Sequence, residues 1–284
     1  VLGALYLNGI SFSSEKLHSF SRTNGGKVEM AFPLPRFGLK IFTVSLLSAG
    51  FYLVIVSSFS NSIADYDLWG YLAFGRIFWE EGYFPFRDAF AYTPTNAPWI
   101  YHEWLAGVFF YPIYKFTGDA GLQLLRYVVI LLTLFLMYAT SLTRCDHKVW
   151  GLVSLLPAMV LISFGYFPVR AQIFTYFFFV LTLLILETVK KEGRLSLLWW
   201  LLPVQILWCN LHGGFVSGLG LIFIYALGQI LSKRTALPLF LAGCAAALGT
   251  LINPYGVRYW SFMIQAVSMP RPEISEWISV LEAL

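Results

Sequence analysis

Several carboxylate side chains lie within residues 65–103 of a largely apolar chain, and their spacing suggests acid–base or metal chemistry. Asp65 and Asp67 are separated by one residue, so the two carboxylates could orient a divalent cation or accept a proton from a hydroxyl group. Asp88 and Glu103 follow in the same stretch, and each of the four could instead be a solvated loop charge. The candidate catalytic residues are Asp67, Asp65, Asp88 and Glu103, with Asp65 and Asp67 as candidate ligands of Mg²⁺ or Mn²⁺.

Polar side chains that could bind a substrate occur at later points of the chain. Arg170 is planar and permanently charged, which suits a phosphate, although its stem could also simply extend along a membrane edge. His212 lies beside a pair of glycines, where a structural role is the alternative. Tyr255 follows an Asn-Pro pair that is otherwise typical of a turn. The candidate substrate-binding residues are His102, Arg170, Gln172, Asn210, His212, Tyr255 and Arg258.

These side chains belong to a chain with the composition of a membrane protein. Of its 284 residues, 58% are hydrophobic and 12% are charged, and the mean hydropathy is +0.70. Such values lie outside the range of soluble globular domains. The net charge of +4 forms no basic stripe, so nucleic acid is not an expected partner. The three cysteines lack the spacing of a metal site, and a disulfide framework is not expected.

Seven apolar segments are long enough, or nearly long enough, to cross a bilayer as helices. They are Ile41–Phe59, Gly121–Leu142, Val149–Phe164, Ile173–Thr188, Leu195–Cys209, Phe215–Leu231 and Ala236–Leu251. An eighth apolar segment, Trp104–Phe116, is short and is expected to lie in the membrane interface. The predicted fold class is therefore all-α, a polytopic transmembrane helical bundle of about seven spans.

The distribution of lysine and arginine predicts the orientation of this bundle. If Trp104–Phe116 does not cross, the basic clusters around Arg144, Lys190 and Lys233 all face the cytoplasm, as the positive-inside rule requires. The N-terminus is then cytoplasmic, and the loop 61–120 with its carboxylates lies on the outer face. We predict an integral membrane protein with an extracytoplasmic active site.

The outer loop and the chain ends complete the predicted organisation. Leu68–Glu80 has apolar side chains at helical spacing, which predicts a second interfacial helix. Residues 1–37 are polar and aperiodic, and we expect a disordered cytoplasmic segment followed by a transmembrane module over residues 38–284. Because the chain ends at Leu284 within an outer segment, we expect further C-terminal helices in the full-length protein.

The order of these elements resembles the N-terminal module of the GT-C superfamily of membrane glycosyltransferases, which includes protein O-mannosyltransferases and aminoarabinose transferases. The resemblance covers roughly residues 38–284 and rests on the loop opening Asp65-Tyr-Asp67-Leu-Trp69 and on similarity to bacterial members over Asp67–Arg76, Asp88–Thr93 and Trp99–Leu105. It implies sugar transfer from a polyprenyl-phosphate-linked donor to a lipid, glycan or protein acceptor. It further implies a location in the bacterial inner (plasma) membrane, in contact with membrane lipids. It also implies that Asp67 is the base or metal partner and that Glu103 occupies the place of a further acidic residue.

Three other functions are compatible with a polytopic protein. A transporter usually places ionisable residues near the middle of its spans, and the centres of the predicted spans lack them. A ligase or polymerase of lipid-linked glycans would share the donor but would rely on outer-loop arginines and histidines. A non-catalytic scaffold is the remaining alternative.

Overall fold

Helices make up all of the regular structure in the described part of this chain. The computed structural model describes residues 42–50, 52–53, 65–95, 97–145, 148–159 and 168–269, and no strand occurs among them. All of these residues belong to one unit, Lys40–Leu284. The predicted all-α fold class is confirmed for this part of the chain. The segment 1–37, for which we predict disorder, and residues 270–284 lie outside the described residues.

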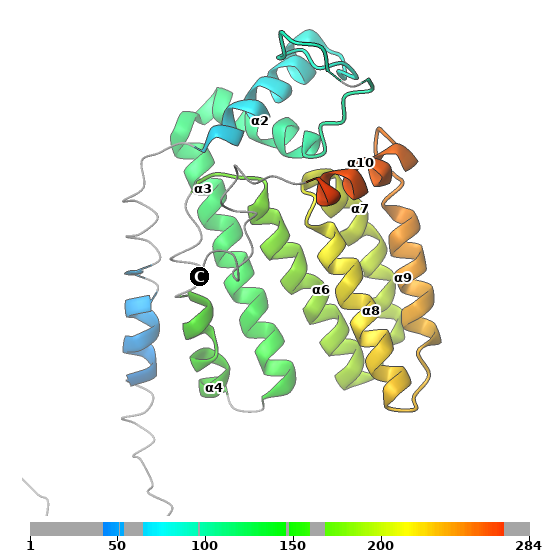
Figure 1. The fold of residues 1–284 in the computed structure, drawn as a ribbon. Helices are drawn as coiled ribbons and strands as arrows, with labels where there is room; N and C mark the ends of the chain where they lie inside the picture. The colour runs from blue at the N-terminus through cyan, green and yellow to red at the C-terminus, as the bar shows by residue number, and fades with distance from the viewer. Residues whose placement is uncertain are drawn as a thin grey trace, which may run out of the picture. The chain divides into compact units, whose positions relative to one another are not determined.

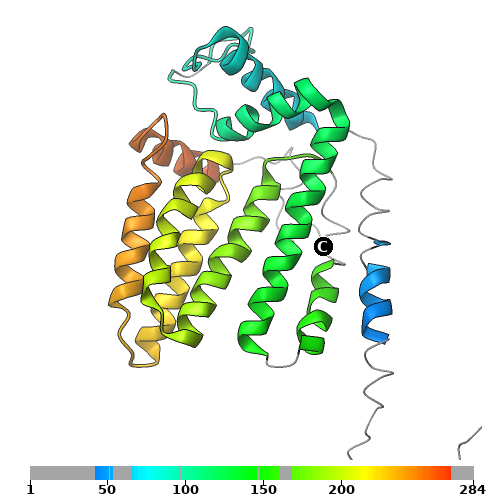
Figure 2. The same ribbon diagram turned by 180° about the vertical axis from the view of Figure 1, so that it is seen from behind.

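Most of the described helices run side by side, and two others lie across one end of this bundle. Besides a helical stretch at residues 42–50, the elements are α2 (Tyr66–Arg76), the π-helical turn η2 (Ile77–Glu81), α3 (Trp104–Arg144), α4 (Lys148–Val153), α6 (Gln172–Glu192), the 3-10 turn η3 (Leu195–Trp200), α7 (Leu201–Leu211), α8 (Phe215–Leu231), α9 (Leu237–Gly249) and α10 (Val257–Ser268). Helices α6, α7, α8 and α9 pack along one another, whereas α2 and α10 lie across one end of them (Figure 1; Figure 2).

Two of the described helices, α3 and α6, are long and apolar enough to cross a membrane. Helices α7, α8 and α9 are apolar but shorter. With 13 residues, α9 is about 20 Å long at 1.5 Å per residue, against a hydrocarbon core of about 30 Å. The predicted bundle of seven spans is therefore not confirmed. Parts of the predicted spans Ile41–Phe59 and Val149–Phe164 lie outside the described residues.

A single glycine divides α3 into two helical parts. Gly118 has φ 62° and ψ −155°, a backbone conformation that is essentially restricted to glycine. The part of α3 before Gly118 lies across the end of the bundle, and the part after it runs along the bundle (Figure 1). The predicted separation of Trp104–Phe116 from Gly121–Leu142 is thus confirmed as a break between two helical segments.

Two glycines allow α2 to pack against the first part of α3 at backbone distance. A Cβ atom at Gly75 would lie 2.2 Å from the carbonyl oxygen of Gly107, and a Cβ atom at Gly107 would lie 2.6 Å from the carbonyl oxygen of Tyr71. The indole of Trp79 adds a hydrogen bond from Nε1 to the carbonyl oxygen of Val108 at 2.9 Å. This close contact fixes α2 relative to the first part of α3.

We expect Gly75→Ala to lower the thermal stability of the protein. The added methyl group would meet backbone atoms, which cannot move aside alone, and such overpacking typically costs about 1–3 kcal/mol. The measurement is the melting temperature of the purified chain. Gly220→Ala in α8 is the matched control, because its added Cβ meets no atom within 4 Å. Equal melting temperatures for the two variants would contradict the close approach of α2 and α3.

Candidate functional site

The carboxylate of Glu103 lies at the centre of a hydrogen-bonded cluster at the end of the bundle covered by α2. Tyr71 of α2 donates its hydroxyl group to Oε2 of Glu103 at 2.6 Å. His212, directly after α7, places Nε2 3.2 Å from Oε1, and Nε2 of His102 lies 3.6 Å from the same oxygen. The Glu103 side chain is only 13% exposed. Two distant segments, α2 and the turn after α7, therefore meet at one largely buried carboxylate.

The hydrogen bonds around His212 assign its tautomer. Nδ1 accepts the backbone N–H of Gly214 at 2.9 Å and lies 2.7 Å from Oγ1 of Thr175. Nε1 of Trp208 donates to that same Oγ1 at 3.0 Å, so the Thr175 hydroxyl can direct its own proton to Nδ1. With Nδ1 surrounded by donors, the proton of neutral His212 belongs on Nε2, where it points to Glu103.

Burial favours the neutral forms of His212 and Tyr71, two of the groups that face Glu103. It lowers the pKa of His212, and the nearby Glu103 carboxylate only partly opposes this shift. Burial also raises the pKa of the Tyr71 hydroxyl, and Glu103 raises it further. At neutral pH a neutral phenol therefore donates to the Glu103 carboxylate, and a neutral imidazole lies 3.2 Å from its other oxygen.

We expect the stability of the folded chain to fall on acidification through the protonation of His212. Because the folded-state pKa lies below the ordinary value of 6.5, the unfolded chain binds more protons than the folded chain at pH values below about 6.5. The contribution of neutral His212 to the free energy of unfolding should thus be complete above that pH. It should be lost as the pH falls towards the folded-state pKa of His212. The melting temperature of wild type should fall more steeply between about pH 7 and pH 5 than that of His212→Asn. Equal slopes would rule out His212 as the titrating group.

A second charged cluster joins the start of α2 to the turn before α6. Arg170 donates from Nη2 to Oδ2 of Asp67 at 2.6 Å, and its Nε lies 3.4 Å from Oδ2 of Asp65. Asp65 is also the N-cap of α2, since its Oδ1 accepts the backbone N–H of Asp67 at 2.9 Å. The Asp67 side chain is 49% exposed, compared with 27% for Arg170. Arg170 therefore holds in place a carboxylate that remains accessible.

The predicted divalent cation at Asp65 and Asp67 does not fit this arrangement. The guanidinium of Arg170 contacts both carboxylates and brings a positive charge to the place where the cation would bind. Among the residues that the structure describes, no group of three or more His, Cys, Asp or Glu side chains gathers in a way that could hold a metal ion. We therefore assign no reaction step to a metal.

The two clusters lie close enough to influence each other electrostatically. His212 experiences the charges of Glu103, Arg170 and Asp67, and Tyr71 experiences those of Glu103 and Asp67. The structure thus brings together an accessible carboxylate, a buried carboxylate and an arginine at one end of the bundle. This combination can accept a proton and stabilise an anion within the same site.

Comparisons of the chain with protein-family models, with curated proteins and with solved structures find no match. The chemistry of this chain therefore has to be argued from its own side chains.

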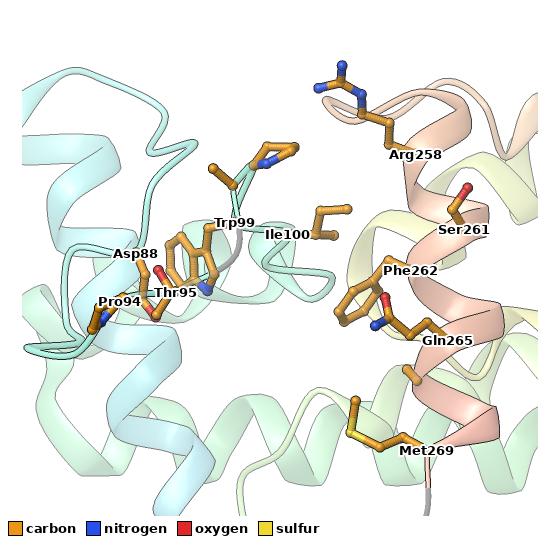
Figure 3. A pocket seen from close by; sticks show the side chains of 13 residues that line it. Asp88, Pro94, Thr95, Trp99, Ile100, Arg258, Ser261, Phe262, Gln265 and Met269 are labelled. Atoms are coloured by element: carbon orange, nitrogen blue, oxygen red, sulfur yellow. The ribbon is translucent and has the colours of Figure 1, made fainter.

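A groove of about 910 Å³ runs between the loop before α3 and helix α10 (Figure 3). Asp88 and Trp99 line the loop side, and Arg258 and Phe262 line the helix side. One oxygen of Asp88 accepts the backbone N–H groups two and three residues later, at 2.9 and 3.1 Å, and so shapes the loop. The Phe262 ring lies 5.5 Å from the His102 ring, centre to centre. The groove is therefore adjacent to the Glu103 cluster.

The side chain of Asn210 connects three helical segments. Its Oδ1 accepts Nε1 of Trp104 at 2.8 Å, while its Nδ2 donates to the carbonyl oxygens of Ile206 at 2.7 Å and Ile252 at 2.9 Å. These bonds hold the start of α3 against α7 and against the segment that follows α9. Asn210 thus has a clear structural role, and its predicted contact with substrate stays a prediction.

Two further predicted substrate-binding residues also have protein partners. The Tyr255 hydroxyl accepts the backbone N–H of Tyr101 at 3.0 Å, and burial raises the pKa of Tyr255 to about 12. Gln172 donates from Nε2 to the hydroxyl group of Tyr176 at 2.9 Å. Tyr255 therefore fixes the loop before Glu103, and neither residue belongs to the two charged clusters.

Three residues of the site were not predicted from the sequence: Tyr71, Thr175 and Trp208. Tyr71 follows Asp67 by four residues, a spacing that places both on one face of α2 and could have indicated a shared site. Thr175 and Trp208 lie in apolar helical segments. Nothing in their local sequence distinguishes them from ordinary packing residues.

Proposed function

We propose that this chain is an integral membrane glycosyltransferase that moves a sugar from a polyprenyl-phosphate-linked donor to an acceptor on the extracytoplasmic face of the bacterial inner membrane. The observation that carries the proposal is the Asp67–Arg170 pair, which places an accessible carboxylate 2.6 Å from a guanidinium beside the Glu103 cluster. The resemblance to GT-C enzymes points to the same reaction.

The proposed reaction gives Asp67 and Arg170 complementary roles. An oxygen of the acceptor hydroxyl group forms a bond to the anomeric carbon of the donor sugar, and the bond from that carbon to the phosphate oxygen breaks. Asp67 accepts the proton of the acceptor hydroxyl group. The polyprenyl phosphate leaves with the electron pair of the broken bond, and Arg170 stabilises the negative charge that develops on it.

Glu103 serves this reaction as a positioning residue. Its carboxylate receives the Tyr71 hydroxyl group and faces Nε2 of His212, and so it links α2 to the turn between α7 and α8. Since Tyr71 and Asp67 share α2, the Glu103 cluster holds the helix that presents the proposed base. Small displacements of a reacting group can lower rates strongly, which gives this support a functional value.

Two grooves next to the site offer room for the substrates. An apolar groove of about 490 Å³ between α7, the start of α3 and the α9–α10 turn includes Trp104 and Leu207 and suits part of the polyprenyl chain. The groove with Asp88 and Arg258 is lined by more polar side chains, which suits a hydroxylated acceptor. We assign the donor lipid to the first groove and the acceptor to the second.

The membrane orientation is supported by the basic residues at the other end of the bundle. Arg144 ends α3, and Lys190 and Lys191 lie in the last turn of α6, at the end away from α2 (Figure 1). Basic side chains favour the cytoplasmic side. The end with Asp67 then faces outwards, where lipid-linked sugars could be used.

The proposal is tested by sugar transfer in membranes that contain the full-length protein. Membranes with and without the protein are supplied with a panel of radiolabelled polyprenyl-phosphate sugars, and label in lipid, glycan and protein fractions is counted. We expect one donor to give protein-dependent transfer. Transfer with no donor would contradict the proposal, and accumulation of intact labelled donor inside sealed vesicles would favour a transporter.

A further inference from the structure

A pocket of about 320 Å³ lies at the end of the bundle opposite Asp67 and Glu103. It is formed where α3, α6 and α8 end, and three basic side chains from these different segments line it. Polar groups near the end of α8 complete the wall. The polar and basic lining residues are Arg144, Lys190, Tyr225, Gln229, Ser232 and Arg234.

The pocket keeps an excess of positive charge. Arg144 is neutralised by Glu187, because its Nε donates to Oε2 at 2.7 Å and its Nη2 donates to Oε1. The Tyr225 hydroxyl also donates to Glu187, whose side chain is only 4% exposed. Within the described part of the chain, no acidic side chain forms an ion pair with Lys190 or Arg234. These two exposed cations are therefore available to an external anion.

An apolar stripe on α8 leads away from the pocket. Ile224, which lines the pocket, is 62% exposed. Leu227, Phe223 and Val216, which follow one face of α8 away from the pocket, are 42%, 68% and 43% exposed. The pocket thus combines cationic groups at its mouth with an apolar path beside it. Such a combination matches an amphiphile that has an anionic head and a hydrocarbon tail.

We propose that this pocket binds the phosphate group of an anionic phospholipid, with one acyl chain along the α8 stripe. Lys190 and Arg234 contact the phosphate, and Gln229 and Ser232 can donate hydrogen bonds to its oxygens. The proposal depends on the membrane placement of the helices and not on glycosyl transfer. A soluble phosphate would satisfy the cations but would leave the apolar stripe unused.

The test compares lipid binding by the purified full-length protein and by two double variants. The probes are phosphatidylglycerol, phosphatidylcholine and inorganic phosphate, and the readout is the number and affinity of ligands retained in native mass spectrometry. Lys190→Gln with Arg234→Gln should weaken phosphatidylglycerol binding roughly tenfold or more. Lys191→Gln with Arg194→Gln removes the same charge from residues that do not line the pocket, and it should change binding by less than about twofold.

Three results would contradict the proposed lipid site. Equal phosphatidylglycerol binding by wild type and the Lys190/Arg234 variant would overturn it, as would equal binding of phosphatidylglycerol and phosphatidylcholine by wild type. Inorganic phosphate that binds as tightly as the lipid would also overturn it, in favour of a soluble anion. If the double variant does not fold, Arg234→Gln alone changes an exposed residue in the α8–α9 turn and should weaken binding in the same direction.

Discussion

Replacing Asp67 with asparagine should lower sugar transfer by about 10²–10⁴-fold, the range expected for a positioned general base. Asparagine keeps the shape of aspartate and still offers Arg170 a hydrogen-bond acceptor, but it cannot take up the proton of the acceptor hydroxyl group. The loss should therefore fall on kcat more than on KM for the donor. Initial rates at saturating labelled donor give this measurement.

The control for this variant is Asp119→Asn. Asp119 is exposed and directly follows Gly118, so the same change of charge is made at a residue outside both clusters. We expect transfer by Asp119→Asn within about twofold of wild type, as is usual for exposed surface changes. Equal rates for Asp67→Asn and wild type would remove Asp67 from the mechanism and would favour one led by arginine, as in a ligase.

Glu103→Gln should produce the second-largest loss, through the position of α2 and not through proton transfer. Glutamine has one acceptor oxygen where the carboxylate has two, so either the Tyr71 hydroxyl group would lose its acceptor or Nε2 of His212 would lose the oxygen that lies 3.2 Å from it. An unsatisfied buried donor costs about 1–3 kcal/mol, which corresponds to a loss of roughly tenfold to hundredfold in transfer if the transition state bears the whole cost.

This variant also has a readout that packing alone would not change. The Glu103 carboxylate raises the pKa of His212 against the larger effect of burial, so its removal should lower that pKa further. The acid-induced loss of stability ends at the folded-state pKa of His212. It should therefore continue to a lower pH in Glu103→Gln than in wild type. Glu80→Gln is the matched control, because it makes the same change at a carboxylate that is 40% exposed and pairs with Lys115 instead of facing His212. An unchanged pH dependence in Glu103→Gln would contradict the proposed contact with His212.

The sequence alone determined where most of the described helices lie, because helix position depends on local patterns. Phe215–Leu231 was predicted with the bounds that α8 has, and Ile173–Thr188 lies within α6. The break before Gly121 was also predictable, since glycine and polar residues interrupt the apolar pattern there. Apolar length alone could not settle the number of spans, because the shorter helices fall below the thickness of the bilayer core.

The composition of the site was predicted in part, whereas its contacts were not. Asp67, Glu103, Arg170 and His212 were all identified by residue type and position. Their partners follow from tertiary packing: Arg170 and Asp67 are separated by 103 residues, and nothing in the local sequence indicated that they would pair. The residue type shows what chemistry a side chain can perform.

Only the tertiary structure decided which of these side chains meet. Glycine contacts bring α2 onto α3, and this packing places the Tyr71 hydroxyl group against Glu103. The hydrogen bonds of Thr175 then direct Nε2 of His212 to the same carboxylate. Such contacts depend on the rotation and separation of packed helices, which are set by side chains far apart in the sequence and have no signature in local spacing.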